Sequence, residues 1–150
     1  MPKQTEVLKT EKTLISQISQ ARDLSHGFLA EAMAARGLKG LVPSHGELLL
    51  ALHLNDAMSM QELATWVQRS KPTVTVLVEK LITQKIVRKR RCPEDGRRFE
   101  VSLTAKGQRL ISTLGDISVE LHQKIDQILS AQEKQQLSKL LSKLTGDWSG

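Results

Sequence analysis

Apolar residues recur every three or four positions along most of the chain, which is the spacing of a helix with one buried face. Two such stripes are long, at about residues 11–36 and 104–129. The shorter helices expected between them cannot cover both stripes within one chain. The pattern therefore predicts two long amphipathic helices that bury their apolar faces against a second copy of the chain.

Polar residues mark where the shorter helices begin. Ser-x-x-Glu sequences, in which the serine and the glutamate cap a helix start reciprocally, occur at residues 44–47, 59–62 and 130–133. Ser70 can cap another helix through its side-chain oxygen. Pro72 then falls in the first turn of that helix, where the N–H that proline lacks is not needed. These signals predict helices from Ser44, Ser59 and Ser70, and a last helix that Gly146 ends.

The hydrophobic period changes from about 3.6 residues to 2 after residue 85. Phe99, Val101 and Leu103 alternate with polar residues, and residues 86–91 precede them across a turn that contains Pro93, Asp95 and Gly96. This pattern predicts a β-hairpin. The expected order is four helices, a hairpin and two helices, which is a mainly α fold with one small β element.

The positive charge of the chain is concentrated in one segment. The net charge is +6 at pH 7, yet residues 69–98 alone hold ten basic and three acidic residues, a net charge of +7. A basic surface confined to this segment is typical of a protein that binds a polyanion, and a solvated charged face is the alternative. No apolar run is long enough to span a bilayer, no secretory signal is evident, and the single cysteine cannot form an internal disulfide. We therefore expect a cytoplasmic protein without a membrane partner.

Two short helices followed directly by a basic hairpin predict a winged helix-turn-helix, which lays its second helix in the major groove of double-stranded DNA. A wing rich in arginine suits the negative potential of a narrow minor groove. The residues expected to face DNA from the helix are Ser70, Lys71, Pro72, Thr73, Thr75, Val76 and Lys80. Those expected in the wing are Arg88, Arg90, Arg91, Asp95, Arg97 and Arg98, with Asp95 holding the turn in shape.

The same residues resemble the MarR (multiple antibiotic resistance regulator) family over most of the chain. The resemblance rests on the sequences SKPTVT at 70–75, LVEKL at 77–81, DGR at 95–97 and LTAKG at 103–107. The family commonly has two successive arginines after the wing aspartate, and here Gly96 replaces the first while Arg97 matches the second.

This resemblance implies one domain over residues 1–150, with the winged core at about 44–103 and dimerisation helices at about 11–36 and 104–145. It also implies a homodimer that regulates transcription, as a repressor that binds a palindromic operator and is released by a small ligand or an oxidant. A two-fold dimer would read half-sites about one helical turn apart.

The effector site is indicated by the resemblance alone. It implies an apolar cleft for a small aromatic effector, for which the candidate residues are His26, Phe28, Met33, His45 and Leu49. A second candidate sensor is Cys92, because the neighbouring arginines favour its thiolate, with an incidental surface thiol as the alternative.

Metal binding and catalysis have little support in the sequence. Asp23 and His26 are one helical turn apart and could approach His45, but no close spacing of His, Cys, Asp or Glu marks a metal site. Nucleophile–base pairs and phosphate-binding loops are also not evident, so we expect neither an enzyme nor a cofactor. A non-specific architectural DNA-binding protein or a protein-interaction scaffold with the same fold is the alternative function.

Overall fold

The computed structural model describes residues 3–148, so the ends of the predicted domain at 1–2 and 149–150 lie outside the described residues. The elements are α1 (Gln4–Ala35), α2 (Pro43–Asn55), β1 (Ala57–Ser59), α3 (Met60–Val67), α4 (Lys71–Thr83), β2 (Val87–Arg91), β3 (Phe99–Leu103), α5 (Ala105–Asp126) and α6 (Ala131–Gly146). Contacts divide the chain into two compact units, Met1–Ile117 and Ser118–Gly150. The single-domain organisation stays a prediction.

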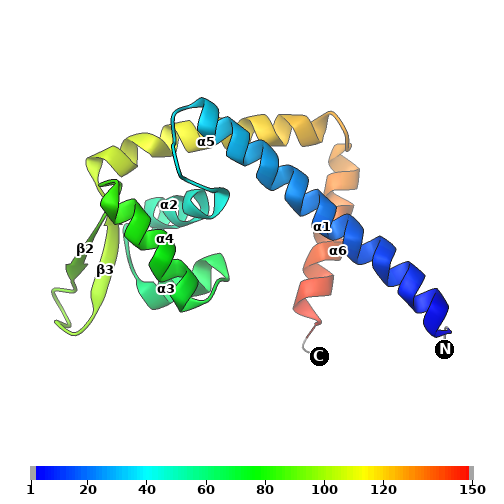
Figure 1. The fold of residues 1–150 in the computed structure, drawn as a ribbon, viewed down its shortest axis with the longest axis horizontal. Coiled ribbons are helices and arrows are strands. Elements are labelled where there is room, and N and C mark those ends of the chain that lie inside the picture. Colours follow the sequence, from blue (N-terminus) through cyan, green and yellow to red (C-terminus); the bar gives the residue numbers. More distant parts are fainter. Residues whose placement is uncertain (1–2, 149–150) are drawn as a thin grey trace. The chain divides into compact units, whose positions relative to one another are not determined.

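In the first unit, α2, α3 and α4 pack together beside a small sheet (Figure 1). The helix predicted from Ser70 is α4, and its apolar residues Val74, Val78 and Leu81, which have the spacing of one helical face, are almost fully buried. Leu48 and Leu63 contribute to the same core from α2 and α3. The mainly α fold with a winged helix-turn-helix is therefore confirmed.

The sheet has three antiparallel strands in the order β1-β3-β2. The sequence pattern predicted the β2–β3 hairpin but not β1, because three residues between two helices are too short to show a period of two. Side chains alternate along a strand, so Arg88 and Arg90 lie on one face of β2 and Lys89 and Arg91 lie on the other. The face with Lys89 and Arg91 also carries Val87, which is buried where β2 begins, whereas Lys89 and Arg91 themselves are exposed.

Three of the four predicted short-helix starts are confirmed. Ser59, Ser70 and Ser130 each accept a hydrogen bond from the backbone N–H three residues further along. The capping box at Ser44 is wrong, since α2 begins at Pro43. There the ring of His45 takes the glutamate's role, and its Nδ1 accepts the Val42 N–H at 2.9 Å. The first long helix also starts earlier than predicted, at Gln4 rather than near residue 11.

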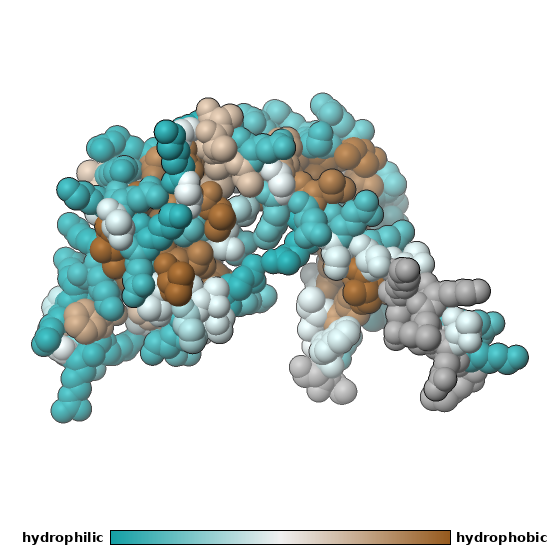
Figure 2. Space-filling view, viewed as in Figure 1, coloured by the Kyte–Doolittle hydropathy of each residue, from teal (hydrophilic) through white to brown (hydrophobic). Residues whose placement is uncertain are grey.

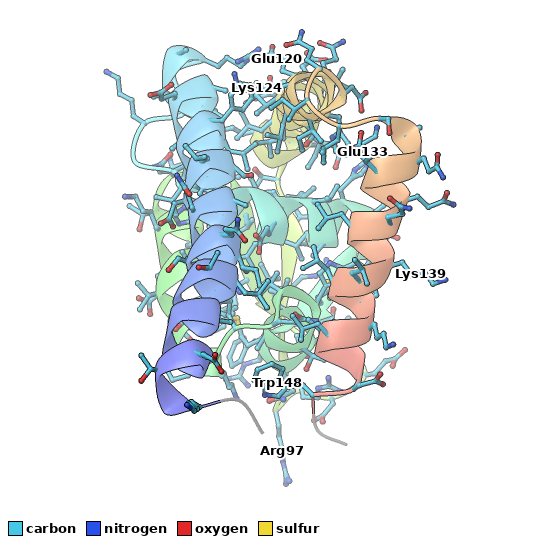
Figure 3. The ribbon with its side chains drawn as sticks, turned by 90° about the vertical axis from the view of Figure 1, so that its right-hand side faces the viewer. Arg97, Glu120, Lys124, Glu133, Lys139 and Trp148 are labelled. Atoms are coloured by element: carbon cyan, nitrogen blue, oxygen red, sulfur yellow. The ribbon has the colours of Figure 1, made fainter. Side chains whose placement is uncertain are left out.

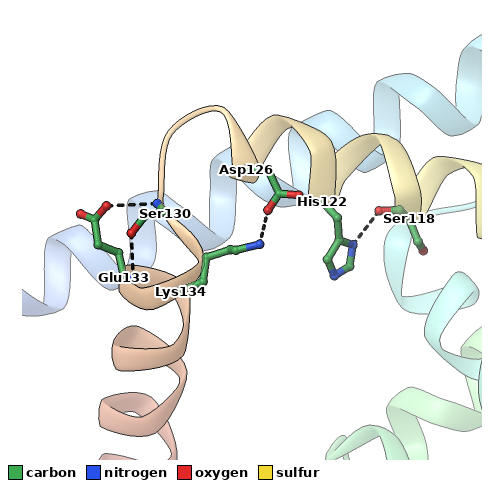
Figure 4. A network of polar contacts seen from close by, with 6 residues as sticks. All are labelled: Ser118, His122, Asp126, Ser130, Glu133 and Lys134. Atoms are coloured by element: carbon green, nitrogen blue, oxygen red, sulfur yellow. Dashed lines mark hydrogen bonds and ion pairs between the residues drawn. The ribbon is translucent and has the colours of Figure 1, made fainter.

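The second unit consists of the end of α5 and the whole of α6 (Figure 4). Ser130 and Glu133 form a complete capping box, and hydrogen bonds from Ser130 hold the pKa of the Glu133 carboxyl below its ordinary value. Lys134 forms an ion pair with Asp126 across the bend between the two helices. None of the described residues of α6 is buried, and its apolar residues Leu137, Leu140, Leu141 and Leu144 are exposed.

No helix in the described part of the chain is both long and apolar enough to cross a membrane.

The start of α5 is fixed by contacts with the segment that follows α4. The Thr104 hydroxyl lies 2.6 Å from the Lys85 carbonyl oxygen and accepts the Gly107 N–H at 3.1 Å. A Cβ atom at position 107 would lie only 2.2 Å from the Ile86 carbonyl oxygen. Glycine at this position therefore allows α5 to approach the backbone that leads into β2.

We expect Gly107→Ala to lower the free energy of unfolding by about 3 kcal/mol, because backbone atoms would have to move to admit the methyl group. Gly115→Ala on the same helix is the matched control, since a Cβ there meets nothing within 4 Å. The control should raise stability by up to about 1 kcal/mol through helix propensity alone. Urea denaturation of both variants tests this, and equal effects would show that the close contact at Gly107 has no energetic role.

Candidate nucleic-acid interface

A tight turn joins α3 to α4. Gln68 adopts the left-handed conformation with a φ of 54°, and the Arg69 N–H returns to the Ala64 carbonyl at 3.1 Å, which ends α3. Ser70 then caps α4 at once. The two helices of the helix-turn-helix are therefore held at a fixed angle by backbone hydrogen bonds as well as by their shared core.

The exposed face of α4 carries most of the residues predicted to meet DNA. Lys71, Pro72 and Thr73 are exposed, and Val76 is 67% exposed although it is apolar. A valine so open to water has no packing role in the single chain, and its methyl groups suit contact with a thymine methyl. Lys71 lies five residues before it, at the start of α4, and can reach a phosphate.

Several hydroxyl groups at the start of α4 are already used within the helix. Ser70 Oγ lies 2.8 Å from Thr73 Oγ1 and also accepts the Thr73 N–H. Thr75 Oγ1 donates to the Lys71 carbonyl at 2.9 Å, and Thr75 is half-buried. Ser70 and Thr75 thus support the local structure of the helix, which leaves Lys71 and Val76 as the better candidates for direct contacts with DNA.

Lys80 lies apart from this group. Nine residues separate it from Lys71, which is about 13 Å along a helix. Its ammonium nitrogen would be 2.8 Å from a Cβ atom at Gly40, in the turn before α2, and Gln84 one turn later donates to the Lys39 carbonyl at 3.2 Å. The structure therefore places the Lys80 side chain beside this turn, far from Lys71 and about one helical turn after Val76.

The turn of the wing is shaped by Asp95, in the role that the sequence suggested. Its Oδ1 accepts the Arg97 N–H at 3.1 Å, and its carbonyl accepts the Arg98 N–H at 3.0 Å. Figure 3 shows the Arg97 side chain projecting outward at the end of the wing. Hydrophilic residues cover the wing in the space-filling view (Figure 2).

The other cations of the wing have distinct surroundings. Arg98 Nη2 lies 3.5 Å from Glu62 Oε1, so an exposed ion pair joins the wing to α3. Lys89 and Arg91 lie over the ring of Phe99, at 4.8 and 5.7 Å from its centre. Such cation–π contacts hold long side chains in place on the hairpin. Arg97 is thus directed outward while its neighbours brace the wing.

The candidate effector residues occupy two kinds of position in the first unit. Met33 and Leu49 belong to the closed core, while His26 and Phe28 of α1 are half-buried. His45 is only 3% exposed, and its Nε2 has no hydrogen-bond partner. Burial first, and the nearby charge of Lys80 second, lower the pKa of His45 from its ordinary value.

The candidate redox residue, Cys92, lies at the end of β2 and is half-buried with a free thiol. Its backbone N–H donates to the Arg98 carbonyl at 2.8 Å, so a modification of the thiol would act at the neck of the wing turn. Within residues 3–148, no group of three or more His, Cys, Asp and Glu side chains is placed to hold a metal ion.

The helix-turn-helix followed by a basic hairpin defines a winged helix-turn-helix protein. A sequence profile of the MarR family matches residues 39–98, and no curated protein matches the chain. The fold is similar to that of S. aureus MepR in a complex with DNA, which is 25% identical with a TM-score of 0.75, over 87% of this chain and 96% of MepR.

Two further solved structures share the fold. A mutant of E. coli MarR complexed with operator DNA is 19% identical with a TM-score of 0.80, over 95% of this chain and 99% of MarR. Bordetella bronchiseptica BpsR is 20% identical with a TM-score of 0.78, over 89% of this chain and 98% of BpsR. The profile match is thus to the MarR family over residues 39–98, and the solved structures share the fold over most of the chain.

We expect His45 to make the stability of the protein depend on pH. Because its pKa is lower in the folded than in the unfolded protein, its contribution is complete above the unfolded pKa of about 6.5. The contribution is lost as the pH falls below that value, when the unfolded state gains a proton that the folded state does not bind. Urea denaturation at pH 7.5 and 5.5 measures this loss.

The decrease in the free energy of unfolding between pH 7.5 and 5.5 should be smaller in His45→Asn, because asparagine keeps an acceptor for the Val42 N–H but does not titrate. His53→Asn at an exposed position of the same helix is the control and should retain the loss seen in the wild type. An unchanged pH dependence in His45→Asn would assign the effect to other groups.

Proposed function

We propose that this protein is a transcriptional regulator that binds double-stranded DNA sequence-specifically as a homodimer and represses by occupying a palindromic operator. The observation that carries this proposal is the exposed face of α4, with Lys71 and the open Val76, next to a wing whose Arg97 points outward. MepR and MarR, which have the same fold, were solved with DNA.

The two parts of this surface have different tasks. The first turns of α4 enter the major groove, where Lys71 contacts phosphate and Val76 contacts base edges. The wing lies along the duplex, and Arg97 enters the negative potential of the minor groove. Such a regulator acts where the chromosome is, so we place it in the cytoplasm.

Exposed apolar residues support the homodimer. In the described part of α1, Leu14, Ile15, Ile18 and Leu24 are exposed, as are four leucines of α6. Stripes of this kind are unfavourable in water and typical of helices that pack against another copy of the chain. A two-fold dimer then reads an inverted repeat.

Release by a small aromatic effector is a second part of the proposal. DNA binding by BpsR is described as regulated by 6-hydroxynicotinic acid. Here His45 offers a buried Nε2 without a partner, which a ligand with a hydrogen-bonding group would satisfy. The other candidate residues for this effector remain His26, Phe28, Met33 and Leu49, and Cys92 remains the candidate for an oxidant.

Selection of binding sites from a random pool of duplexes tests the proposal. We expect an inverted repeat to be enriched, with an affinity at least about 10³-fold above that for a scrambled duplex and a strong dependence on salt. DNA binding without an enriched sequence would favour an architectural protein. No binding to DNA would favour a protein-interaction scaffold.

Two substitutions should separate the tasks of wing and helix. Arg97→Ala should weaken binding to the selected and the scrambled duplex alike, because its contact is with groove potential and phosphate. Val76→Ala should lower the preference for the selected duplex by roughly 1–3 kcal/mol for an affected base contact.

Arg109→Ala, which removes an exposed charge of α5, is the control and should change neither quantity more than about twofold. The reverse assignment, with discrimination lost in Arg97→Ala and kept in Val76→Ala, would contradict the proposed docking of α4 and the wing.

A further inference from the structure

A pocket of about 360 Å³ lies at the base of the wing, on the face of β2 that carries Arg88 and Arg90. The end of α2, strand β1 and the first turn of α5 complete its walls, and Gln108 contributes from α5. All of these elements belong to the first unit. We propose that this pocket binds a small organic anion, with one phosphate or carboxylate group on a short apolar body.

The arginines of the pocket are separated from the other wing cations by strand alternation. Lys89 and Arg91 point to the opposite face, where they lie over Phe99. Arg88 and Arg90 therefore form a distinct pair on one surface. Guanidinium groups present planar arrays of donors that match the oxygens of a phosphate or a carboxylate.

The donor side chains of the pocket are held by hydrogen bonds to uncharged groups, so the charge of Arg88 is not neutralised. Arg88 Nε donates to Ser102 Oγ at 3.3 Å, and Ser102 is itself only 8% exposed. This contact orients Arg88 and leaves its two terminal nitrogens to other acceptors. On the opposite wall, Gln108 Nε2 and His53 Nδ1 lie 3.2 Å apart, so each side chain orients the other.

The balance of charge favours an anion. Among the described residues, no carboxylate lies within ion-pair distance of Arg88 or Arg90. Glu100 is the residue opposite Arg90 in the register of β2 and β3, but the two side chains form no ion pair. Asp56 is the acidic side chain among the residues that line the pocket. Glu100 lies beside Arg90 but is not among the lining residues, so the two guanidinium groups and the one carboxylate of the lining leave a net charge of +1 for a ligand to neutralise.

The apolar part of the lining narrows the class of ligand. Leu52, Ala57 and Leu103 line the same pocket as the donors. A bare inorganic ion would leave this apolar surface in contact with water, whereas an organic group would cover it. We therefore expect phenyl phosphate to bind more tightly than inorganic phosphate, and both to bind more tightly than chloride.

Binding of the anion would also affect DNA. The bound anion neutralises two cations at the base of the wing and so lowers the positive potential that attracts phosphates. This consequence rests on the proposed function, while anion binding itself does not. An experiment can therefore disprove the effect on DNA binding without disproving anion binding.

Titration of the DNA-free protein with inorganic phosphate and with phenyl phosphate, at constant ionic strength set by chloride, tests the site. Calorimetry should show saturable binding to the wild type. Arg88→Gln and Arg90→Gln should each weaken it at least about tenfold, the loss expected on removal of a charge-assisted hydrogen bond.

Lys89→Gln and Arg91→Gln are matched controls, because they remove the same charge from the same strand but from the opposite face. They should change the affinity less than about threefold, which is the scale of a screened charge nearby. Gln108→Leu tests the α5 wall independently of the strand and should also weaken binding. Thermal melts of all five variants check that each is folded.

Equal losses in all four strand variants would overturn the proposal, since they would mean that the anion senses only the general charge of the wing. No saturable binding of phenyl phosphate to the wild type would overturn it as well. In a separate experiment, phenyl phosphate should weaken DNA binding by the wild type and have little effect on the Arg90→Gln variant. If phenyl phosphate weakens DNA binding equally in both proteins, the anion site has no influence on DNA binding.

Discussion

The carbonyl group of Ile86 is the point on which the arrangement of the winged unit depends. The Ile86 N–H closes the end of α4 on the Leu81 carbonyl at 2.9 Å, and its carbonyl accepts the Thr104 N–H at 3.0 Å. One buried residue therefore joins the end of α4, the first strand of the wing and the start of α5. The close approach of Gly107 to the same oxygen lets α5 begin there without displacing the strand. The angle between helix and wing is thus set by short backbone contacts, which deform less readily than side-chain packing.

The charges of the wing are sorted by geometry more than by residue type. Alternation along β2 divides its cations between the ring of Phe99 and the pocket beside Ser102, while Glu62 retains Arg98 at the side of α3. Arg97 is carried outward by the turn that Asp95 shapes. A segment that looks uniformly basic in the sequence therefore contains cations with different environments, and they are expected to respond differently to salt and to ligands.

Much of the fold follows from the sequence because its signals are local. The stripe of α4 and the caps at Ser59, Ser70 and Ser130 depend on residues within a turn or two of one another. What the sequence hides is non-local or exceptional. Strand β1 exists only through its pairing with β3, and the cap of α2 uses a histidine ring where a glutamate was expected. The positions of Lys80 beside Gly40 and of Arg88 beside Ser102 also depend on contacts between distant segments, which periodicity does not encode.

The hydroxyl groups of Ser70, Thr73 and Thr75 maintain the first turns of α4, whereas Lys71 and Val76 stand on its surface without bearing on its folding. Under the proposed function, stability and DNA recognition therefore depend on different positions of the same helix. Substitutions at the two exposed positions leave the core unchanged, so under the proposed function a change of target sequence requires no repacking of the fold. The helix is in this sense evolvable, because its exposed positions can change while its buried positions keep the fold.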